Sequence, residues 1–408
     1  MGEEGFLRQH LRSYYSKNEI NSVPEISARE FGIGDFGKKI SNRHLDFKNN
    51  LELNSFLREK TPFYISYSNA RYEFPGARPM EKKNLLGADL IYEFDADDIQ
   101  TDCKLNHDSW KCSFCGAHGK GAPEKCSECG FGVKVEEWVC QECLGETRKQ
   151  TQKLLNLLEK DFGFNDGISV NFSGSKGFHT HIRSSSIQKL SKSARLELLD
   201  YITCTNLSLE SLGFASKAKN VFLCPKRTLV RGWAKKLMNS LVSLLEGEDA
   251  AKIAVMGGIT VSSAKKFLKE KQRIISSMDR GLLINVPGIK PEKFYPGILN
   301  YIVQEEKLEV DRQTSIDINK IIRVPDSLHG STGLVAKPVS LDELSSFDAL
   351  KETVVFGSDP IKLKNISAPK FYLNNETFGP FENENALLPL FAGIYLIARG
   401  SALLESES

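Results

Sequence analysis

The chain has 408 residues, of which 40% are hydrophobic and 26% are charged. This globular composition excludes a collagen, a continuous coiled coil and wholesale disorder, and the length predicts two to three structural units. Lys and Arg number 54 against 52 Asp and Glu, so the formal net charge is only +2. A protein with that balance does not coat nucleic acid through overall charge, and any polyanion would have to bind a local basic patch.

The chain carries no apolar segment of membrane-spanning length. Its longest apolar stretch, residues 386–398, contains a proline and is too short to cross a bilayer. The first residues lack the basic and then apolar run of a signal peptide. We therefore expect a soluble, cytosolic protein without membrane contact.

The first half of the chain mixes helical and strand patterns. Residues 1–60 are typical of mixed helix and loop, with helical spacing over 6–16. Further along, the pattern predicts β-rich runs at 62–68 and 88–97, a helix over 148–162, and strands over 167–172 and 178–182 on either side of a glycine-rich turn. The segment 103–143 is rich in Gly, Cys and Lys without a steady period, which indicates a metal-stapled insertion.

The second half changes character twice. Residues 186–280 are mostly helical and locally basic, with helices predicted over 194–204, 234–245 and 262–276. Short strands and turns return over 310–339, residues 342–379 are weakly patterned, and 386–400 is an apolar helix candidate. The predicted domains are a discontinuous core (1–100, 145–185 and 281–408), a zinc-binding insertion (101–144) and a helical insertion (186–280).

Two carboxylates close the strand-like run over residues 88–97. Because side chains alternate between the faces of a strand, Asp95 and Asp97 are expected to share one face. Two carboxylates about 4 Å apart repel by roughly 4 kcal/mol at an effective dielectric of about 20. Either a divalent cation lies between them, as in two-metal phosphoryl transfer, or the strand end is solvated.

A glycine-rich turn, Asn171-Phe-Ser-Gly-Ser-Lys-Gly-Phe-His-Thr-His181, follows the next short strand. Its glycines permit close approach of the backbone to a ligand, and its N–H groups with Lys176 could cradle a phosphate. His179 and His181 share a strand face and could donate to phosphate or bind metal. The alternative is a hairpin turn with two surface histidines.

A distal segment adds a third carboxylate, an arginine and a histidine within 20 residues. Asp311 and Asp317 precede Arg323, and His329 begins the run His-Gly-Ser-Thr-Gly. Arg323 suits bidentate contact with phosphate. The alternative is a charged loop with a structural histidine.

Taken in order, these three pieces resemble the archaeal/eukaryotic DNA primase small (catalytic) subunit, and an archaeal member most of all. The same family resemblance extends to Arg29-Glu-Phe, Asn42-Arg-His, the run Tyr64–Glu73 and Cys140-x-x-Cys143 before a helix. The resemblance covers roughly residues 5–340. It implies a mixed α/β primase core whose sheet carries the site, with the zinc-binding and helical insertions, and de novo synthesis of short RNA primers, with DNA primers open, on single-stranded DNA.

The resemblance also implies roles for single residues. Asp95, Asp97 and Asp311 would hold two Mg²⁺ or Mn²⁺ ions, with Asp317 as the competitor for the third position. The phosphates of the incoming NTP or dNTP would contact a set of six residues: Ser173, Lys176, His179, Arg323, His329 and Arg43. Glu30 would help at the initiation site. The family works with a large subunit that carries an iron–sulfur cluster, so a heterodimer is expected.

Seven of the nine cysteines lie between Cys103 and Cys143. Cys112, Cys115, Cys126 and Cys129 form a four-cysteine zinc signature. With the family's zinc site placed before the helix, the remaining Cys103, His107, Cys140 and Cys143 predict a second structural zinc. A repeated Trp-x-Cys-x-x-Cys would also allow Cys112 and Cys115 to pair with Cys140 and Cys143. Cys204 and Cys224, outside this cluster, are expected to be small buried residues.

A basic stretch over residues 217–236 carries Phe222 and Trp233 among its lysines and arginines. Positive charge with interleaved aromatics suits a single-stranded template, whereas the alternative is a solvated helix face over buried aromatics. Three other functions stay open at this stage: a repair-type polymerase that extends primers, a non-catalytic zinc protein that binds nucleic acid, and a metal-dependent phosphohydrolase.

Overall fold

A computed structural model describes residues 2–164, 166–218, 221–310 and 312–405. The chain divides into two compact units. The sheet unit comprises Met1–Gln152, Asn165–Leu196 and Glu309–Ser408, and the helical unit comprises Lys153–Phe164 and Glu197–Leu308. The helical unit thus extends past the predicted boundary at residue 280 and takes in the end of the helix that follows the cysteine-rich segment.

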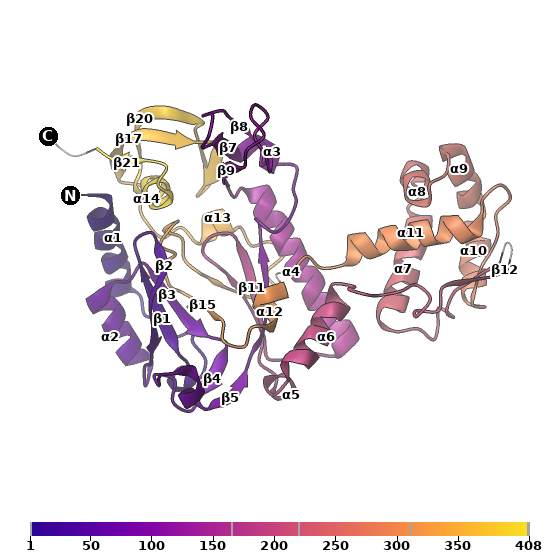
Figure 1. Cartoon of the computed structure of the whole chain (residues 1–408), viewed down its shortest axis with the longest axis horizontal. Helices are drawn as coiled ribbons and strands as arrows, with labels where there is room; N and C mark the ends of the chain where they lie inside the picture. The colour runs from indigo at the N-terminus through magenta and orange to yellow at the C-terminus, as the bar shows by residue number, and fades with distance from the viewer. Residues whose placement is uncertain (1, 165, 219–220, 311, 406–408) are drawn as a thin grey trace. The chain divides into compact units, whose positions relative to one another are not determined.

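One four-stranded sheet of the sheet unit has the order β15-β3-β1-β2, and its neighbours run antiparallel. Its strands are Phe31–Asp35 (β1), Lys38–Leu45 (β2), Tyr64–Ser68 (β3) and Ile321–Arg323 (β15). Two helices flank these strands in the chain and contact each other: α1 (Glu3–Lys17) and α2 (Asn50–Lys60), seen in Figure 1. The expectation of helix and loop over residues 1–60 missed β1 and β2. Their glycines and charged residues, as in Phe31-Gly-Ile-Gly-Asp35, hide the strand pattern.

The second four-stranded sheet has the order β16-β10-β11-β6 and is also antiparallel. Its strands are Leu90–Asp95 (β6), Ile168–Phe172 (β10), Gly177–Ile182 (β11) and Pro338–Val339 (β16). The register of β6 and β11 sets Gly177 opposite Asp95 and His179 opposite Glu93. One face of this pair is apolar, because Tyr92 and Phe94 alternate with the acidic residues and are buried.

The predicted zinc-binding insertion, residues 101–144, contains a three-stranded sheet of order β8-β7-β9. Its elements are Lys104–His107 (α3), Ser109–Cys112 (β7), His118–Lys120 (β8) and Val133–Glu136 (β9). A small apolar cluster of Trp110, Cys112 and Cys126 lies under this sheet. Because so few apolar residues are buried there, bound metal would have to supply much of the stability of the insertion.

The C-terminal part of the sheet unit contains strands where the sequence was weakly patterned. The main hairpin pairs Pro360–Ala368 (β17) with Phe381–Pro389 (β20). The predicted helix over 386–400 is shorter, Leu390–Arg399 (α14), because β20 continues to Pro389 and Gly400 ends the helix at φ +75°. The other short elements of this unit are Ala70–Tyr72 (β4), Leu85–Ala88 (β5), Ser185–Gln188 (α5), Arg312–Ile316 (α12), Ala349–Glu352 (α13), Phe371–Leu373 (β18), Glu376–Phe378 (β19), Leu403–Leu404 (β21) and two 3₁₀ turns, Ile26–Ala28 and Met80–Lys83.

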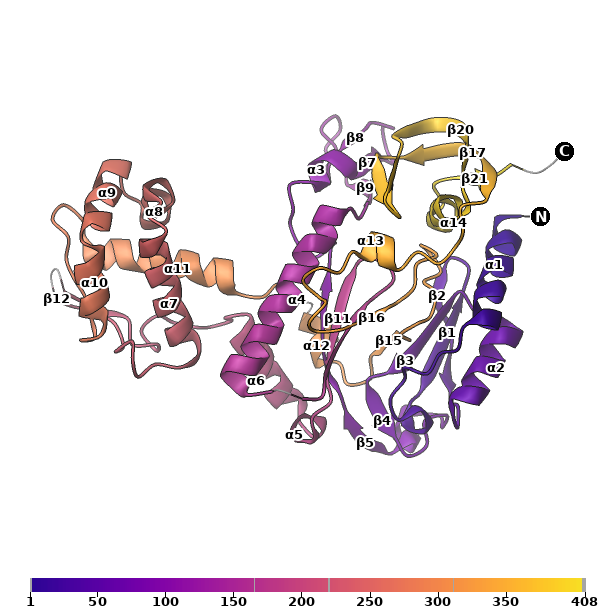
Figure 2. The same ribbon diagram turned by 180° about the vertical axis from the view of Figure 1, so that it is seen from behind.

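The helical unit is built around a single apolar core, and its helices can be followed from the reverse side in Figure 2. They are Gly232–Glu246 (α7), Ala250–Gly257 (α8), Val261–Lys269 (α9), Lys271–Met278 (α10) and Pro291–Glu306 (α11), with short strands Ala215–Ala218 (β12), Val221–Leu223 (β13) and Leu282–Leu283 (β14). The predicted helix over 262–276 is therefore two helices. Gln141–Phe162 (α4) and Lys192–Ile202 (α6) have residues in both units.

Local capping fixes where these helices begin and end. The Asp249 side chain accepts the N–H of Lys252 at the start of α8, and Thr260 accepts that of Ser263 at the start of α9. Gly258 ends α8 in the left-handed region at φ +61°. In the part of the chain that the structure describes, no helix is long and apolar enough to cross a membrane.

Candidate active site

The carboxylate edge, which we define as Glu93, Asp95 and Asp97, lies where β6 ends. Glu93 and Asp95 share the polar face of the strand, as alternation predicts. The expectation that Asp95 and Asp97 share one strand face is wrong, because β6 ends at Asp95 and Asp97 lies in the turn that follows. The N–H of Ala96 donates to the Lys176 carbonyl at 3.1 Å, so this turn is held against the glycine-rich turn.

The electrostatics of the carboxylate edge indicate that a positive charge belongs there. Burial raises the pKa of Asp95 to about 6, and Glu93 and Asp97 raise it further while His179 opposes them. The Oδ1 atoms of Asp95 and Asp97 are both buried and accept no hydrogen bond. Buried oxygens without a donor are rare in folded proteins, and carboxylate oxygens are the ligands that Mg²⁺ prefers. The edge therefore fits a divalent cation.

Lys176 is the cation nearest to the carboxylate edge. Its Nζ lies 2.5 Å from Asp97 Oδ2 and 3.1 Å from Glu137 Oε2. Burial would lower the pKa of Lys176, but its hydrogen bonds and attraction to Asp97 and Glu137 outweigh that and raise it. A flexible ammonium group held by two acids can be transferred to a phosphate when a metal ion takes over the aspartate.

The glycine-rich turn is held by its own first side chain. Ser173 Oγ accepts the N–H groups of Ser175, Lys176 and Gly177 at 3.2–3.4 Å. The expected cradle of free N–H groups is therefore not present at these three positions. The serine shapes the turn, and Lys176 and the adjoining histidine are left to meet a ligand.

The glycines of this turn allow close approach to neighbouring backbone. A Cβ at Gly177 would lie 1.8 Å from the Phe94 carbonyl oxygen of β6. A Cβ at Gly174, where φ is +80°, would lie 2.9 Å from His329 Cβ. Thr332 Oγ1 also donates to the Gly174 carbonyl at 2.6 Å. The turn is thus packed between β6 and the loop that follows His329.

Arg323 and His329 approach from the first sheet. The Arg323 guanidinium lies over the Tyr64 ring, 4.8 Å from its centroid, and His329 meets the same ring edge-on at 5.4 Å. Burial lowers the pKa of His329 well below its usual value, and Arg323 and His179 are among the cations that lower it further. Arg323 Nε is buried without an acceptor, so this group has an open position for an anion.

Arg43 on β2 is aligned by a buried glutamate. Glu30 is fully buried, and its two carboxylate oxygens accept from Arg43 at 2.9 and 3.3 Å. Lys83 lies 3.7 Å from the same carboxylate. Glu30 therefore positions Arg43, and its expected role at the initiation site stays a prediction.

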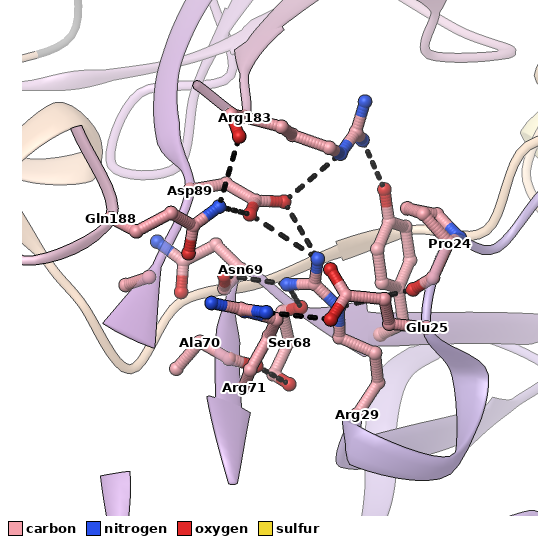
Figure 3. Close-up of polar contacts among 12 residues, drawn as sticks. Pro24, Glu25, Arg29, Ser68, Asn69, Ala70, Arg71, Asp89, Arg183 and Gln188 are labelled. Carbon is pink, nitrogen blue, oxygen red and sulfur yellow. Dashed lines mark hydrogen bonds and ion pairs between the residues drawn. The ribbon is translucent and has the colours of Figure 1, made fainter. Parts of the chain in front are cut away.

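Figure 3 shows the polar network that fixes the start of β6. Asp89, directly before the strand, is fully buried and accepts from Arg29 at 3.0 Å, Arg183 at 3.1 Å and Gln188 at 3.0 Å. Arg29 comes from the chain before β1, and Arg183 follows β11. One buried carboxylate thus ties together the ends of the two sheets, and its two arginines compensate its charge.

Two acidic residues and one lysine near the site were not singled out from the sequence. Glu93 Oε1 lies 4.0 Å from His179 Nε2, and Lys320 Nζ lies 3.7 Å from Glu93 Oε2. Glu137, beside Lys176, comes from the end of the zinc-binding insertion. Strand alternation already placed Glu93 on the face of Asp95. No local sequence pattern linked Glu137 and Lys320 to the site, because both are far from β6 along the chain.

The third carboxylate of the prediction, Asp311, lies outside the described residues. The helix α12, which begins at Arg312, packs against β6. Its competitor Asp317 is exposed, and its carboxylate accepts the N–H of Asn319 at 2.9 Å within a local turn. His181 is fully enclosed and stacks on Tyr67 at 6.2 Å, so it is a packing residue and not a surface ligand.

The eight predicted zinc ligands gather into two sets. Cys103, His107, Cys140 and Cys143 form one, and Cys112, Cys115, Cys126 and Cys129 form the other, with all ligand atoms of each set within 4.8 Å of one another. The sulfur–sulfur distances of 3.4–3.8 Å match the roughly 3.8 Å edge of a tetrahedron with Zn–S bonds of about 2.3 Å. The alternative pairing of Cys112 and Cys115 with Cys140 and Cys143 is not what the structure brings together.

The mixed set has an outer partner that suits metal binding. His107 Nε2 lies 3.3 Å from Cys143 Sγ, while its Nδ1 lies 2.8 Å from Asp108 Oδ1. The same Asp108 oxygen accepts the Trp138 N–H at 2.9 Å. A carboxylate behind a histidine fixes the ring and raises its basicity as a ligand. Both sets therefore fit Zn²⁺ and leave no position for a substrate.

The basic stretch does not have the expected aromatic face. Phe222 and Trp233 are 3% and 2% exposed and pack in the helical unit, so both are buried aromatics, as the alternative predicts, and neither can stack on template bases. Lys219 lies outside the described residues. Cys224 is buried as expected, and Cys204 is half-buried.

Comparison with known proteins bears directly on this arrangement. A family model described as DNA primase small subunit matches residues 135–341. The chain is also 30% identical to the DNA primase small subunit PriS of Methanothrix thermoacetophila, over 97% of this chain and 98% of that protein. The chain belongs to the DNA primase small subunit family.

Other archaeal relatives agree over the full length. The DNA primase small subunits PriS of Nitrosopumilus maritimus and Natronomonas pharaonis are 28% and 27% identical, each over 98% of both chains. The family resemblance drawn from the three motifs is thereby confirmed, and with it the role of a DNA primase catalytic subunit in replication. The mixed α/β fold of this primase small subunit also agrees with the expectation.

Proposed function

We propose that this primase subunit joins nucleotides at the carboxylate edge, on a single-stranded DNA template and without a pre-existing primer. The observation that carries the proposal is the pair of buried, unpartnered oxygens, Asp95 Oδ1 and Asp97 Oδ1, at the end of β6. Two Mg²⁺ or Mn²⁺ ions bound there would activate the 3′-hydroxyl and stabilise charge on the α-phosphate. Asp311 is the proposed third ligand.

The cations around the edge suit the triphosphate of the incoming nucleotide. Lys176 would leave Asp97 for a phosphate oxygen, and His179 lies on the next strand opposite Glu93. Arg323 and His329 would meet the triphosphate from the first sheet, with Arg43 held in place by Glu30. Ser173 would act by shaping the turn that carries Lys176.

The two cysteine sets are proposed to hold one structural Zn²⁺ each. Because all four positions of each set are protein ligands, neither ion would take part in catalysis. The large subunit with an iron–sulfur cluster remains the expected partner, since the family name denotes a small subunit. A location in the archaeal cytosol stays a prediction.

Primer synthesis by the purified chain tests this proposal. The reaction contains single-stranded DNA, labelled NTPs or dNTPs and Mg²⁺ or Mn²⁺, with and without an added primer, for the wild type and for Asp95→Asn/Asp97→Asn. Asp98→Asn is the matched control, because this exposed carboxylate lies in the same turn.

Unprimed products from the wild type and the control, but not from the double variant, are expected. Products only with an added primer would favour a repair-type polymerase or a need for the large subunit. Equal products from all three chains would place the chemistry elsewhere. Silence of the wild type even with the large subunit would favour the non-catalytic alternative.

A further inference from the structure

The helical unit contains a second charged region, a cavity of about 640 Å³ that the primase motifs do not include. We call it the cationic cavity. Its lining comes from the last three turns of α4, the first turns of α7 and the end of α11. Five cationic side chains line it, Lys153, Lys160, Arg231, Lys235 and Lys236, against two acidic ones, Asp161 and Glu306.

The two acids of the cationic cavity are already engaged. Asp161 Oδ2 accepts the Tyr201 hydroxyl at 2.9 Å. Glu306 pairs with Lys236 at 3.2 Å and accepts from Ser240 at 3.2 Å. Lys153 donates to a backbone carbonyl, that of Glu305, at 2.8 Å. With five cationic side chains against two acidic ones, the lining keeps an excess of three positive charges.

Three exposed cations are left without a partner among the described residues: Lys160, Arg231 and Lys235. Arg231 and Lys235 lie four residues apart on one side of α7, and Lys160 faces them from α4. Like charges gathered in one hollow cost stability, and such a gathering attracts polyanions. Asn156 and Asn239 add neutral donors to the same lining.

The local backbone holds this arrangement in place. Gly232 begins α7 at φ +54°, and a Cβ there would lie 2.5 Å from the Tyr201 hydroxyl oxygen. Trp233 Nε1 donates to the Tyr201 carbonyl at 2.8 Å, which fixes the start of α7. The Arg231 side chain makes no capping bond to the helix, so its guanidinium stays available.

We propose that the cationic cavity binds consecutive phosphates of single-stranded DNA, as a second contact for the template. No aromatic side chain lines the cavity within the described residues, so the contact reads the backbone and not the base sequence. The inference rests on the proposed function in one respect, which is that the bound strand is the template for primer synthesis.

The test measures binding and not synthesis, by fluorescence anisotropy of a labelled oligodeoxynucleotide over a range of salt. The chain carries Asp95→Asn/Asp97→Asn throughout, so catalytic turnover does not interfere. Lys160→Ala/Arg231→Ala/Lys235→Ala is compared with Lys252→Ala/Lys265→Ala/Lys266→Ala, which removes the same charge from exposed positions of α8 and α9. Thermal unfolding of both triples shows whether each still folds.

The cavity triple should bind at least tenfold more weakly than the control triple. Its plot of log affinity against log salt should be shallower by about 2, since three phosphate contacts on a single strand are lost. Equal affinity and slope for the two triples would overturn the proposal.

Titration with a ribonucleoside triphosphate separates the two sources of phosphate. A loss of nucleotide affinity as large as the loss of oligonucleotide affinity would assign the cavity to free nucleotide and overturn the assignment to template. Failure here with normal primer synthesis by the wild type would leave the proposed function intact. Weaker oligonucleotide binding by the cavity triple, without primer synthesis by the wild type, would support the cavity as a DNA site and contradict the proposed function.

Discussion

The carboxylate edge of the sheet unit and the cationic cavity of the helical unit are opposite in charge and in construction. At the edge, Asp95 and Asp97 have buried oxygens that no donor meets, so the missing partner is a cation. In the cavity, Lys160, Arg231 and Lys235 meet no acid within the described residues, so the missing partner is an anion. A metal-dependent reaction on a polyanionic template needs both a site for cations and a site for phosphates.

The two regions also differ in how their residues are brought together. The edge comes from two hydrogen-bonded strands whose register sets Gly177 against Asp95. The cavity comes from side chains of three helices, and its unpaired cations Lys160 and Arg231 are about 70 residues apart in the sequence. We therefore expect little tolerance to substitution at the edge, and smaller effects when any one cation of the cavity is replaced.

The largest effect should follow from removing the charge of the edge. Asp95→Asn/Asp97→Asn should lower primer synthesis on the order of 10³-fold or more, because single electrostatic contacts to a transition state contribute about 10²–10³. The melting temperature should stay level or rise, since the substitution relieves repulsion between the two neighbouring carboxylates. A large drop in melting temperature would mean that the two residues are structural.

Loss of zinc from the set of Cys103, His107, Cys140 and Cys143 should impair the carboxylate edge and leave DNA binding at the cationic cavity unchanged. Cys143→Ser should remove one zinc equivalent and destabilise the sheet unit by roughly 3 kcal/mol or more, because Cys143 is buried and Glu137 and Trp138 adjoin its site. Cys115→Ser, at an exposed ligand, should also remove one equivalent with less effect on synthesis. Zinc content, unfolding curves and primer synthesis are measured for both variants. Equal loss of synthesis in the two variants would contradict the distinction.

The glycine at the edge should tolerate no side chain. Gly177→Ala should destabilise the protein by about 1–3 kcal/mol or more, because its Cβ would overlap the Phe94 carbonyl. Gly37→Ala is a control at a glycine with open space around it, where only the backbone strain of φ +71° acts. Chemical denaturation compares the two. A larger loss of unfolding free energy in Gly37→Ala than in Gly177→Ala would show that β6 and β11 move apart easily to admit the new side chain.

Exchanging single lysines sharpens the comparison between the regions. Lys176→Ala should raise the KM for nucleotide about tenfold and leave oligonucleotide binding unchanged, because this lysine lies at the edge. Lys160→Ala should weaken oligonucleotide binding and leave the KM for nucleotide unchanged. This effect should be smaller than that of Lys176→Ala, because four other cations remain in the cavity. Steady-state kinetics measure the KM for nucleotide, and fluorescence anisotropy measures oligonucleotide affinity. The same change in both variants would contradict the assignment of nucleotide to the edge and of template to the cavity.

The smallest effect concerns pH. Burial lowers the pKa of His181 well below 6.5, so the unfolded chain takes up a proton near that pH and the folded chain does not. The free energy of unfolding therefore falls as pH drops below about 6.5, by up to about 1.4 kcal/mol at pH 5.5 from this residue. His181→Gln should flatten that fall relative to the exposed control His118→Gln. Parallel curves of unfolding free energy against pH for the two variants would exclude His181 as a source of the pH dependence.

Much of the edge could be predicted from the sequence because its signals are local. Strand alternation put Glu93 and Asp95 on one face, and the spacing of glycines marked the turn before His179. The strands β1 and β2 were missed because glycines and charges interrupt their pattern. The basic stretch over residues 217–236 already marked Arg231 and Lys235, but the cavity itself could not be predicted, because Lys153 and Lys160 join them only in the folded helical unit.

The most direct test of the account is metal binding at the carboxylate edge. Mn²⁺ titration of the nucleotide-free chain, followed by electron paramagnetic resonance with the cysteine sets loaded with zinc, compares the wild type with Asp95→Asn/Asp97→Asn and Asp98→Asn. We expect saturable binding by the wild type and the Asp98 control, and its loss in the double variant. Unchanged Mn²⁺ binding in the double variant would contradict the assignment of the unpartnered Asp95 and Asp97 oxygens as the metal ligands of this primase subunit.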